Sequence, residues 1–227
     1  QGMRVSILTR EYPPYIYGGA GVHVGQLVPQ LRKFCDSVDV QCMGEPREGA
    51  TAHAEDYPAG ANGAIRTLGA DVAMAAAVPP VDVIHSHTWY AQFAGIIAGL
   101  FQDVATVVTA HSLEPDRPWK VEQLGGGYRV SSWIEKTAYQ NADAVIAVSA
   151  AMIENIQNAY PFVERERIHV VKNGIDPDEF KPDPNTDVIE GLGVDLTKPI
   201  VTFVGRITRQ QGLVHLVRAA RLLDPDT

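Results

Sequence analysis

Three glycines lie within four positions where a helix is expected to begin. An apolar run at Val5–Leu8 predicts the first strand, the chain then reads Gly18-Gly19-Ala20-Gly21, and a helical pattern covers 22–34. Glycines at a helix entry let the backbone approach a ligand, and the helix N-terminus attracts anions such as a diphosphate. A tight turn that needs glycine only for its backbone angles accounts for the same residues. The loop by itself leaves phosphate binding and a structural turn both open.

Polar and aromatic side chains follow the apolar runs that predict strands. Glu11 follows the first run, His87 and Trp89 follow the run at 81–84, and His111 follows the run at 105–109. In an open parallel sheet, ligands bind beyond the carboxyl ends of the strands. We therefore expect these side chains at one edge of a sheet, with His111 as a functional candidate and a structural strand-end histidine as the alternative. Trp89 is suited to stacking on a sugar or to packing in the core.

A metal site is not predicted. His85 and His87 are two residues apart and share a face in extended backbone. No third ligand stands at a metal-site spacing from them, and there is no HExxH motif. Histidines that line a sugar pocket or end a strand fit this spacing better.

Two arginines stand at further positions suited to phosphate. Tyr128 and Arg129 follow a glycine triplet at an expected helix start, and Arg206 follows an apolar run at 200–204. A guanidinium binds phosphate in a bidentate manner. A solvated charge at Arg129 and a surface ion pair at Arg206 are the alternatives.

The elements that must position these residues alternate between strand and helix. The patterns predict strands at 5–8, 37–42, 64–67, 81–85, 105–109, 144–148 and 168–171, helices at 22–34, 71–77, 89–100, 128–141 and 150–159, and long loops at 45–62 and 112–127. Apolar strands separated by helices imply a parallel sheet covered on both faces. Right-handed crossovers then give an α/β, doubly wound, Rossmann-like domain.

The composition changes after residue 176. We expect the Rossmann-like domain over 1–176 and a proline-rich, acidic linker over 177–198. Residues 199–227 contain one predicted strand at 200–204 and one helix at 213–223. A single βα unit cannot bury its own apolar faces, so we interpret it as the start of a second domain.

Composition excludes several classes of protein. The chain has 227 residues, 45% of them hydrophobic and 20% charged, with a formal net charge of -8. These values indicate a globular protein that does not bind nucleic acid, and no apolar run reaches membrane-spanning length. The two cysteines match no metal or redox motif, so we expect reduced thiols and a cytoplasmic protein; a homo-oligomer is compatible with the sequence. GxxxxGK[ST], GxSxG and GxGxxG are absent, which leaves NAD binding a weakly supported alternative.

The motifs together resemble a known family. The segments that carry the resemblance are Thr9–His23, His85–Trp89, Thr109–Pro115, Ala144–Ser149, Val171–Asp176 and Val204–Arg206. They resemble the GT4 glycosyltransferases. Arg117–Lys120 and Glu122–Arg129 are similar to the actinobacterial glycogen synthase type, which uses ADP-glucose and includes the α-maltose-1-phosphate synthases.

The resemblance implies a GT-B fold of two Rossmann-like domains, with the active site in the cleft between them. The reaction would retain the anomeric configuration and need no metal or cofactor, with ADP-glucose as donor. The N–H groups of Gly18, Gly19, Ala20 and Gly21 would bind the donor diphosphate. His111 would contact the transferred sugar near the reacting carbon, and Arg206 would hold the diphosphate.

The same resemblance implies an acceptor site on the amino-terminal domain. Its candidate residues are Glu11, His87, Trp89, Tyr128 and Arg129. Arg129 is similar in position to an arginine that binds the acceptor phosphate in relatives. Glucose 1-phosphate is therefore expected as an acceptor beside an α-glucan. Another GT4 sugar transferase and a non-catalytic carbohydrate-binding module are the alternatives.

Two features depart from the family pattern. Gln211 stands where a lysine that contacts the diphosphate is expected, and loss of that charge would weaken stabilisation of the leaving group. The chain also ends before the E-x7-E segment and most of the donor domain. We expect this chain to be inactive without that missing carboxyl-terminal domain.

Overall fold

The computed structural model describes residues 2–223, apart from the side chains of Gln123 and Leu124. The chain forms two units that divide between Asp176 and Pro177. Each unit is described by itself.

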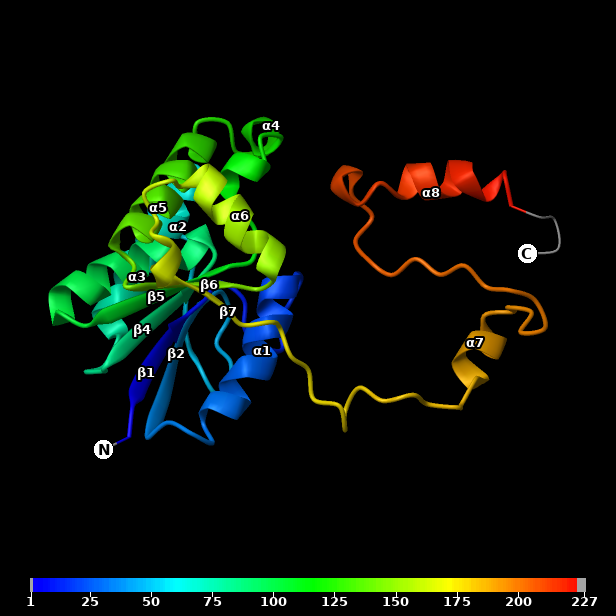
Figure 1. Cartoon of the computed structure of the whole chain (residues 1–227), viewed down its shortest axis with the longest axis horizontal. Helices are drawn as coiled ribbons and strands as arrows, with labels where there is room; N and C mark the ends of the chain where they lie inside the picture. Colours follow the sequence, from blue (N-terminus) through cyan, green and yellow to red (C-terminus); the bar gives the residue numbers. More distant parts are fainter. Residues whose placement is uncertain (1, 224–227) are drawn as a thin grey trace. The chain divides into compact units, whose positions relative to one another are not determined.

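A parallel sheet forms the centre of the first unit (Figure 1). Within the described residues it has seven strands in the order β3-β2-β1-β4-β5-β6-β7, and every neighbouring pair is parallel. The strands are β1 (Arg4–Leu8), β2 (Ser37–Met43), β3 (Thr51–His53), β4 (Val83–His87), β5 (Ala105–Ala110), β6 (Ala144–Ala147) and β7 (Ile168–Val170). The chain runs outward from β1 to β3, then from β4 to β7, so the order reverses between β1 and β4. The predicted doubly wound, Rossmann-like α/β fold is confirmed.

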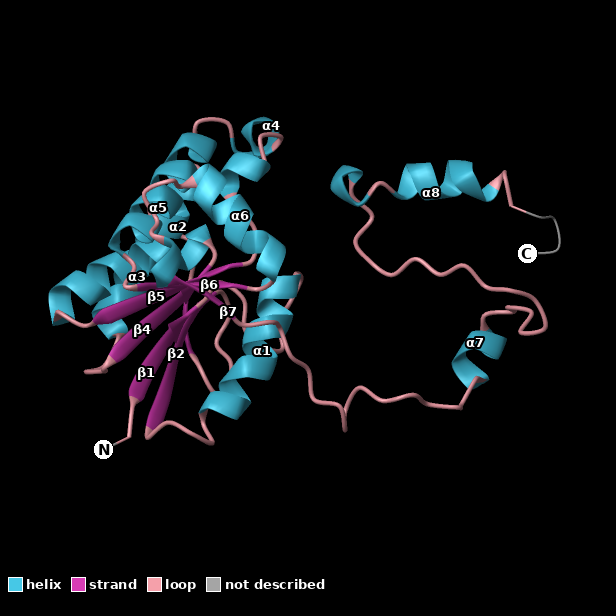
Figure 2. Cartoon of the chain, viewed as in Figure 1, coloured by secondary structure: helices cyan, strands magenta, loops and turns pink. Residues whose placement is uncertain are grey.

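Helices cover both faces of this sheet (Figure 2). They are α1 (Gly19–Leu31), α2 (Gly63–Ala77), α3 (Trp89–Gln102), α4 (Lys120–Leu124), α5 (Gly127–Asn141) and α6 (Ala150–Ala159). Successive strand residues point to opposite faces. Ile7 packs in one core cluster with Val24 and Val28 of α1, whereas Leu8 packs in another with side chains of α2 and α3. Burial on both faces explains why the strands are continuously apolar.

The strand predicted at 64–67 is wrong. This segment belongs to α2, which begins at Gly63 and includes the helix predicted over 71–77. The side chain of Asn62 caps this helix by accepting a hydrogen bond from the Ala64 N–H at 2.8 Å. An asparagine cap satisfies an N–H that a strand would have to pair elsewhere, so it favours the helix. The two predicted loops also contain regular structure, namely β3 in the first and α4 in the second.

Within residues 177–223, the second unit has two α-helices, α7 (Asp187–Gly191) and α8 (Leu213–Ala220), and a 3-10 helix at Arg209–Gln211. The predicted strand at 200–204 is wrong, because this segment pairs with no other strand among the described residues. A strand forms only where a neighbour accepts its hydrogen bonds. No residue from 177 to 223 is buried, which agrees with the inference that one βα unit cannot form its own core.

Between residues 2 and 223, no helix combines the length and the apolar character needed to cross a bilayer.

Candidate active site at the carboxyl edge of the sheet

The topology brings three strand ends together. β4 lies between β1 and β5, with Leu8 beside Ser86 and His87 beside Thr109. The residues that follow these strands therefore meet at the carboxyl edge where the strand order reverses. Open α/β sheets bind their ligands at this position.

The glycine turn has both a packing role and an exposed backbone. A Cβ on Gly21 would lie 2.8 Å from Cβ of Glu11, and one on Gly18 would lie 3.3 Å from Oε2 of Glu11. Gly21 is needed because a Cβ there would collide with Glu11, whereas a Cβ on Gly18 would require only a small shift of the Glu11 carboxylate. A Cβ on Gly19 would meet nothing within 4 Å, so no steric contact demands glycine there. Gly19, Ala20 and Gly21 form the first turn of α1, and N–H groups in a first turn have no partner inside their helix.

Glu11 supports this turn. Its side chain is 9% exposed, and its Oε1 accepts a hydrogen bond from the Tyr17 N–H at 2.6 Å. The carboxylate thus fixes the chain one residue before the glycines. The structure gives Glu11 a positioning role, and its contact with an acceptor stays a prediction.

Four histidine rings at the carboxyl edge contact one another. His23 of α1 has its ring centre 5.0 Å from that of His111, which follows β5. Nδ1 of His87 and Nε2 of His111 are hydrogen-bonded at 3.0 Å. His85 turns to Thr109, where its Nε2 lies 2.7 Å from the hydroxyl oxygen. The predicted strand-end histidine His111 therefore lies beside His23, which begins the second turn of α1.

Burial keeps these imidazoles neutral. Desolvation lowers the pKa of His85 to about 3 and that of His111 to about 4, and it lowers the pKa of His23 and His87 as well. The neighbouring rings add to the effect on His85, His87 and His111, because two adjacent imidazoles disfavour positive charge on one another. At neutral pH the cluster has donors and acceptors without a net charge.

Two predicted acceptor residues are buried, and their contact with an acceptor stays a prediction. Trp89 is 2% exposed and packs with Ala64 and Ile134, so its ring belongs to the core. His87 is fully buried, and its Nδ1 is hydrogen-bonded to Nε2 of His111. β4 ends two residues later than the predicted strand, so His87 is its last residue, and Trp89 begins α3. Sequence position alone does not distinguish a side chain on the pocket wall from one behind it.

Between these two residues the backbone is strained. Thr88 has a φ of 64° and a ψ of 161°, a region that is nearly restricted to glycine. Its hydroxyl oxygen is buried and has no hydrogen-bond partner among the described residues. Strain of this kind persists only where the surrounding structure enforces it, and it clusters at functional sites.

A buried polar network, which the sequence reasoning missed, holds the loop after His111. Nζ of Lys120 lies 2.5 Å from Oε1 of Glu114, and the Ser131 hydroxyl donates to Oε2 at 2.8 Å. Glu135 accepts hydrogen bonds at its Oε1 from the Glu114 N–H at 2.8 Å and from the Tyr160 hydroxyl at 2.5 Å. Burial raises the pKa of Glu135 to about 7. The only signal in the sequence was that Glu114 and Lys120 stand within the resembling segments.

The remaining polar residues of this edge differ in exposure. The Tyr128 hydroxyl donates to the Glu114 carbonyl at 2.9 Å, so Tyr128 belongs to the loop's support. Arg129 is exposed in the first turn of α5 and is open to an anion. Arg10, which was also missed, lies 4.1 Å over the Tyr90 ring and pairs with Glu55 at 3.1 Å. Arg10 follows β1 directly, as a residue of the carboxyl edge should.

Arg206 and Gln211 belong to the second unit, and both are exposed there. Their roles at the diphosphate stay predictions.

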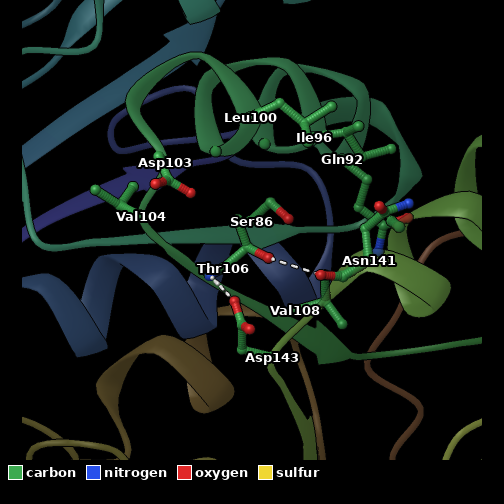
Figure 3. Close-up of a pocket in the computed structure, with 13 residues that line it drawn as sticks. Ser86, Gln92, Ile96, Leu100, Asp103, Val104, Thr106, Val108, Asn141 and Asp143 are labelled. Carbon is green, nitrogen blue, oxygen red and sulfur yellow. Dashed lines mark hydrogen bonds between the residues drawn. The ribbon is translucent and has the colours of Figure 1, made fainter.

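A separate hollow is lined by residues of α3, α5, β4 and β5 (Figure 3). Its volume is about 210 Å³, and Asp103, Asn141 and Asp143 are among the residues that line it. Thr106 donates its N–H to Asp143 at 2.8 Å and its hydroxyl to the Asn141 carbonyl at 3.3 Å, as Figure 3 shows. These groups join the starts of β5 and β6 to the end of α5. Gln92 also lines the hollow, and its Oε1 is buried without a hydrogen-bond partner among the described residues.

The fold is that of the GT-B glycosyltransferases. Anabaena Alr3699/HepE in complex with UDP-glucose matches 99% of this chain and 58% of its own length, with a TM-score of 0.74 and 19% identity. The catalytic domain of starch synthase IV from Arabidopsis thaliana, bound to ADP and acarbose, matches 98% of this chain and 66% of its own length, with a TM-score of 0.66 and 17% identity. At these identities the likeness shows the fold alone.

The sequence identifies the family. The pattern of Glycosyltransferase Family 4 matches residues 17–179, so the chain belongs to this family. It is 57% identical to alpha-maltose-1-phosphate synthase of Mycolicibacterium smegmatis and 54% identical to that of Mycobacterium tuberculosis, in each case over 99% of this chain. The chain spans 59% of the length of these relatives.

Proposed function

We propose that the chain is the acceptor-side part of a retaining glucosyltransferase that moves glucose from ADP-glucose to glucose 1-phosphate or an α-glucan. One observation carries the proposal. His111 lies 5.0 Å, between ring centres, from His23 of α1, which places a strand-end imidazole beside a helix N-terminus. A sugar at His111 would then have its diphosphate next to the N–H groups of the first turn. The alpha-maltose-1-phosphate synthases, at 54% and 57% identity, support this choice of donor and acceptor.

The proposed chemistry is glucosyl transfer. The bond from C1 of glucose to the diphosphate breaks, an acceptor hydroxyl oxygen bonds to C1, and its proton leaves. Negative charge grows on the diphosphate, and the first turn of α1 with Arg206 would stabilise it. Positive charge grows at C1, as in other glycosyl transfers. The low pKa of His111, about 4, keeps its ring neutral, so it can hydrogen-bond the sugar without opposing that charge.

Arg129 favours a phosphorylated acceptor. It is exposed in the first turn of α5, where the N-terminus of a 15-residue helix adds partial positive charge. An α-glucan chain carries no charge, so neither Arg129 nor the N-terminus of α5 would attract it electrostatically. Glucose 1-phosphate is therefore the preferred acceptor of the proposal.

ADP release from ADP-glucose tests the substrates. The protein to assay contains this chain and the carboxyl-terminal domain, with glucose 1-phosphate and with glycogen as acceptors. We expect ADP release with either acceptor, faster with glucose 1-phosphate, and a raised KM for glucose 1-phosphate in Arg129→Ala. Turnover of another nucleotide sugar in place of ADP-glucose would overturn the donor and favour another transferase of the family.

Residues 1–227 alone should give no turnover, because Arg206 and Gln211 begin the donor side without the remainder of that domain. Robust activity of the isolated chain would contradict the assignment of donor binding to the carboxyl-terminal domain. In the longer protein, Gln211→Lys should raise kcat by restoring a charge at the diphosphate. If the longer protein is inactive both with Gln211 and after Gln211→Lys, the non-catalytic carbohydrate-binding module is favoured.

A further inference from the structure

Three imidazoles from distant parts of the sequence form a compact triangle. His23 comes from α1, His87 ends β4, and His111 follows β5. Their ring centres are 5.0, 5.3 and 5.5 Å apart. One ring nitrogen of each lies within 4.8 Å of the others. His85 stands outside this set, since its Nε2 is hydrogen-bonded to Thr109.

This triangle has nearly the dimensions of a trihistidine zinc site. Imidazole nitrogens bind zinc tetrahedrally at about 2.0–2.1 Å, which puts the ring centres roughly 5 Å apart and the nitrogens about 3.4 Å apart. The observed ring centres already meet the first condition. Nδ1 of His87 and Nε2 of His111, at 3.0 Å, are close to the second. A small rotation of the His23 ring, which is only half-buried, brings in the third nitrogen.

The triangle also has unused ligand capacity. Nδ1 of His23 is buried and has no hydrogen-bond partner among the described residues. Buried polar atoms without partners are rare in native structures and indicate a missing one, such as an ion. A metal binds the unprotonated nitrogen of an imidazole. The proton that His87 and His111 share would move to the other nitrogen of its own ring.

We propose that His23, His87 and His111 form a binding site for a divalent transition-metal ion, with Zn²⁺ as the best match. Three protein nitrogens leave the fourth position open to water or an anion, as in three-ligand zinc sites. His23 stands one turn into α1, and a helix N-terminus favours an anion in its vicinity. If the proposed function is correct, His111 cannot bind the donor sugar and the ion together. Zn²⁺ then inhibits transfer by competing with the donor.

Metal binding is tested on residues 1–227 alone. Zn²⁺ is titrated against a chromophoric chelator, and Co²⁺ reports the ligands by its visible spectrum. We expect one ion per chain, with no near-ultraviolet band from thiolate ligation by Cys35 or Cys42. His23→Gln and His87→Gln should each weaken Zn²⁺ binding at least tenfold. His169→Gln and His215→Gln alter exposed histidines and should leave it unchanged.

Circular dichroism of each variant shows whether it is folded, and His23→Gln is the safer variant because His23 is only half-buried. The absence of saturable binding, a thiolate band, or equal losses in His169→Gln or His215→Gln would overturn the site. The inhibition is tested separately in the longer protein, where Zn²⁺ should raise the KM for ADP-glucose without lowering kcat. Binding without inhibition would overturn only the competition, and inactivity of the metal-free longer protein would count only against the proposed function.

Discussion

The polar groups at the two edges of the sheet differ in how completely they are paired. At the amino edge, Arg4 at the start of β1 makes three hydrogen bonds to the carboxylate of Asp82, at 2.8, 2.8 and 3.2 Å. Thr106 and Asp143 are joined by two hydrogen bonds, at 2.8 and 2.9 Å. At the carboxyl edge, by contrast, His23, His87 and Thr88 each have a buried polar atom without a partner among the described residues.

This difference indicates which edge binds a ligand. Both edges carry polar and charged side chains, so their presence alone is not informative. Paired groups hold the starts of the strands in place and gain nothing from a ligand. Unpaired buried groups cost free energy that a bound sugar, phosphate or ion can recover. Substitutions at the carboxyl edge should therefore separate activity from stability, whereas those at the amino edge should not.

Gly19→Asp is expected to have a large effect on activity. The added side chain enters open space, and a carboxylate in the first turn of a helix stabilises it by about 0.3–1 kcal/mol. The same charge repels the donor diphosphate. We expect higher stability together with a loss in kcat/KM for ADP-glucose of about 100-fold, the size found for a lost oxyanion donor.

Gly19→Ala is the matched control and should keep most of the activity. A Gly19→Asp protein that is both more stable and fully active would show that no anion binds at the first turn of α1.

Lys120→Met tests the paired part of the carboxyl edge. It leaves Glu114 buried without its cation, and such losses cost about 3–5 kcal/mol. Urea unfolding measures the change. Lys33→Met, at an exposed lysine of a helix end, should cost little. A loss below about 1 kcal/mol for Lys120→Met would mean that the network does not hold the loop after His111.

Glu135→Gln should change how stability depends on pH. The pKa of Glu135 is raised from 4.5 to about 7, so the folded protein takes up a proton between these values. The contribution of Glu135 to the free energy of unfolding is fully present below pH 4.5. It is lost as the pH rises through about 7, and the loss is at most about 3 kcal/mol. The variant should lose this slope.

The measurement is the free energy of unfolding at intervals from pH 4.5 to 7.5. Glu154→Gln, at an exposed position of α6, should keep the slope of the unmodified protein. Parallel profiles for the protein and Glu135→Gln would contradict the raised pKa.

Thr88→Gly is expected to give the smallest effect, a gain in stability of about 1 kcal/mol from relief of the strained backbone. Asp103 at the amino edge also has a positive φ, of 52°, but in the left-handed region that aspartate tolerates. Asp103→Gly should therefore raise stability, measured by thermal unfolding, less than Thr88→Gly does. Equal gains would show that strain is not concentrated at the carboxyl edge.

Local pattern and topology rules predicted much of this domain from the sequence. Apolar runs separated by helices implied the parallel sheet, and the rule for strand ends placed His111 at the carboxyl edge. The errors involve interactions that a run of residues does not contain. The segment at 64–67 became helical because Asn62 caps it, and 200–204 formed no strand because no neighbour pairs with it.

The candidate site shows the same limit. His23 was not predicted, because its approach to His111 depends on how α1 packs on the sheet. Lys120 and Glu114 are six residues apart, but their burial is a result of the tertiary fold. The sequence left Trp89 open between stacking on a sugar and packing in the core, and only the packing of α2, α3 and α5 shows that it is buried.

The most direct test compares the two edges in one assay. His111→Ala removes an imidazole from the unpaired edge, and Asp143→Asn weakens a pair at the other edge. Steady-state ADP release is measured for both variants of the longer protein with ADP-glucose and glucose 1-phosphate. We predict that kcat falls at least about 100-fold for His111→Ala and stays within about twofold for Asp143→Asn. Similar kcat values for the two variants would contradict the assignment of the active site to the carboxyl edge.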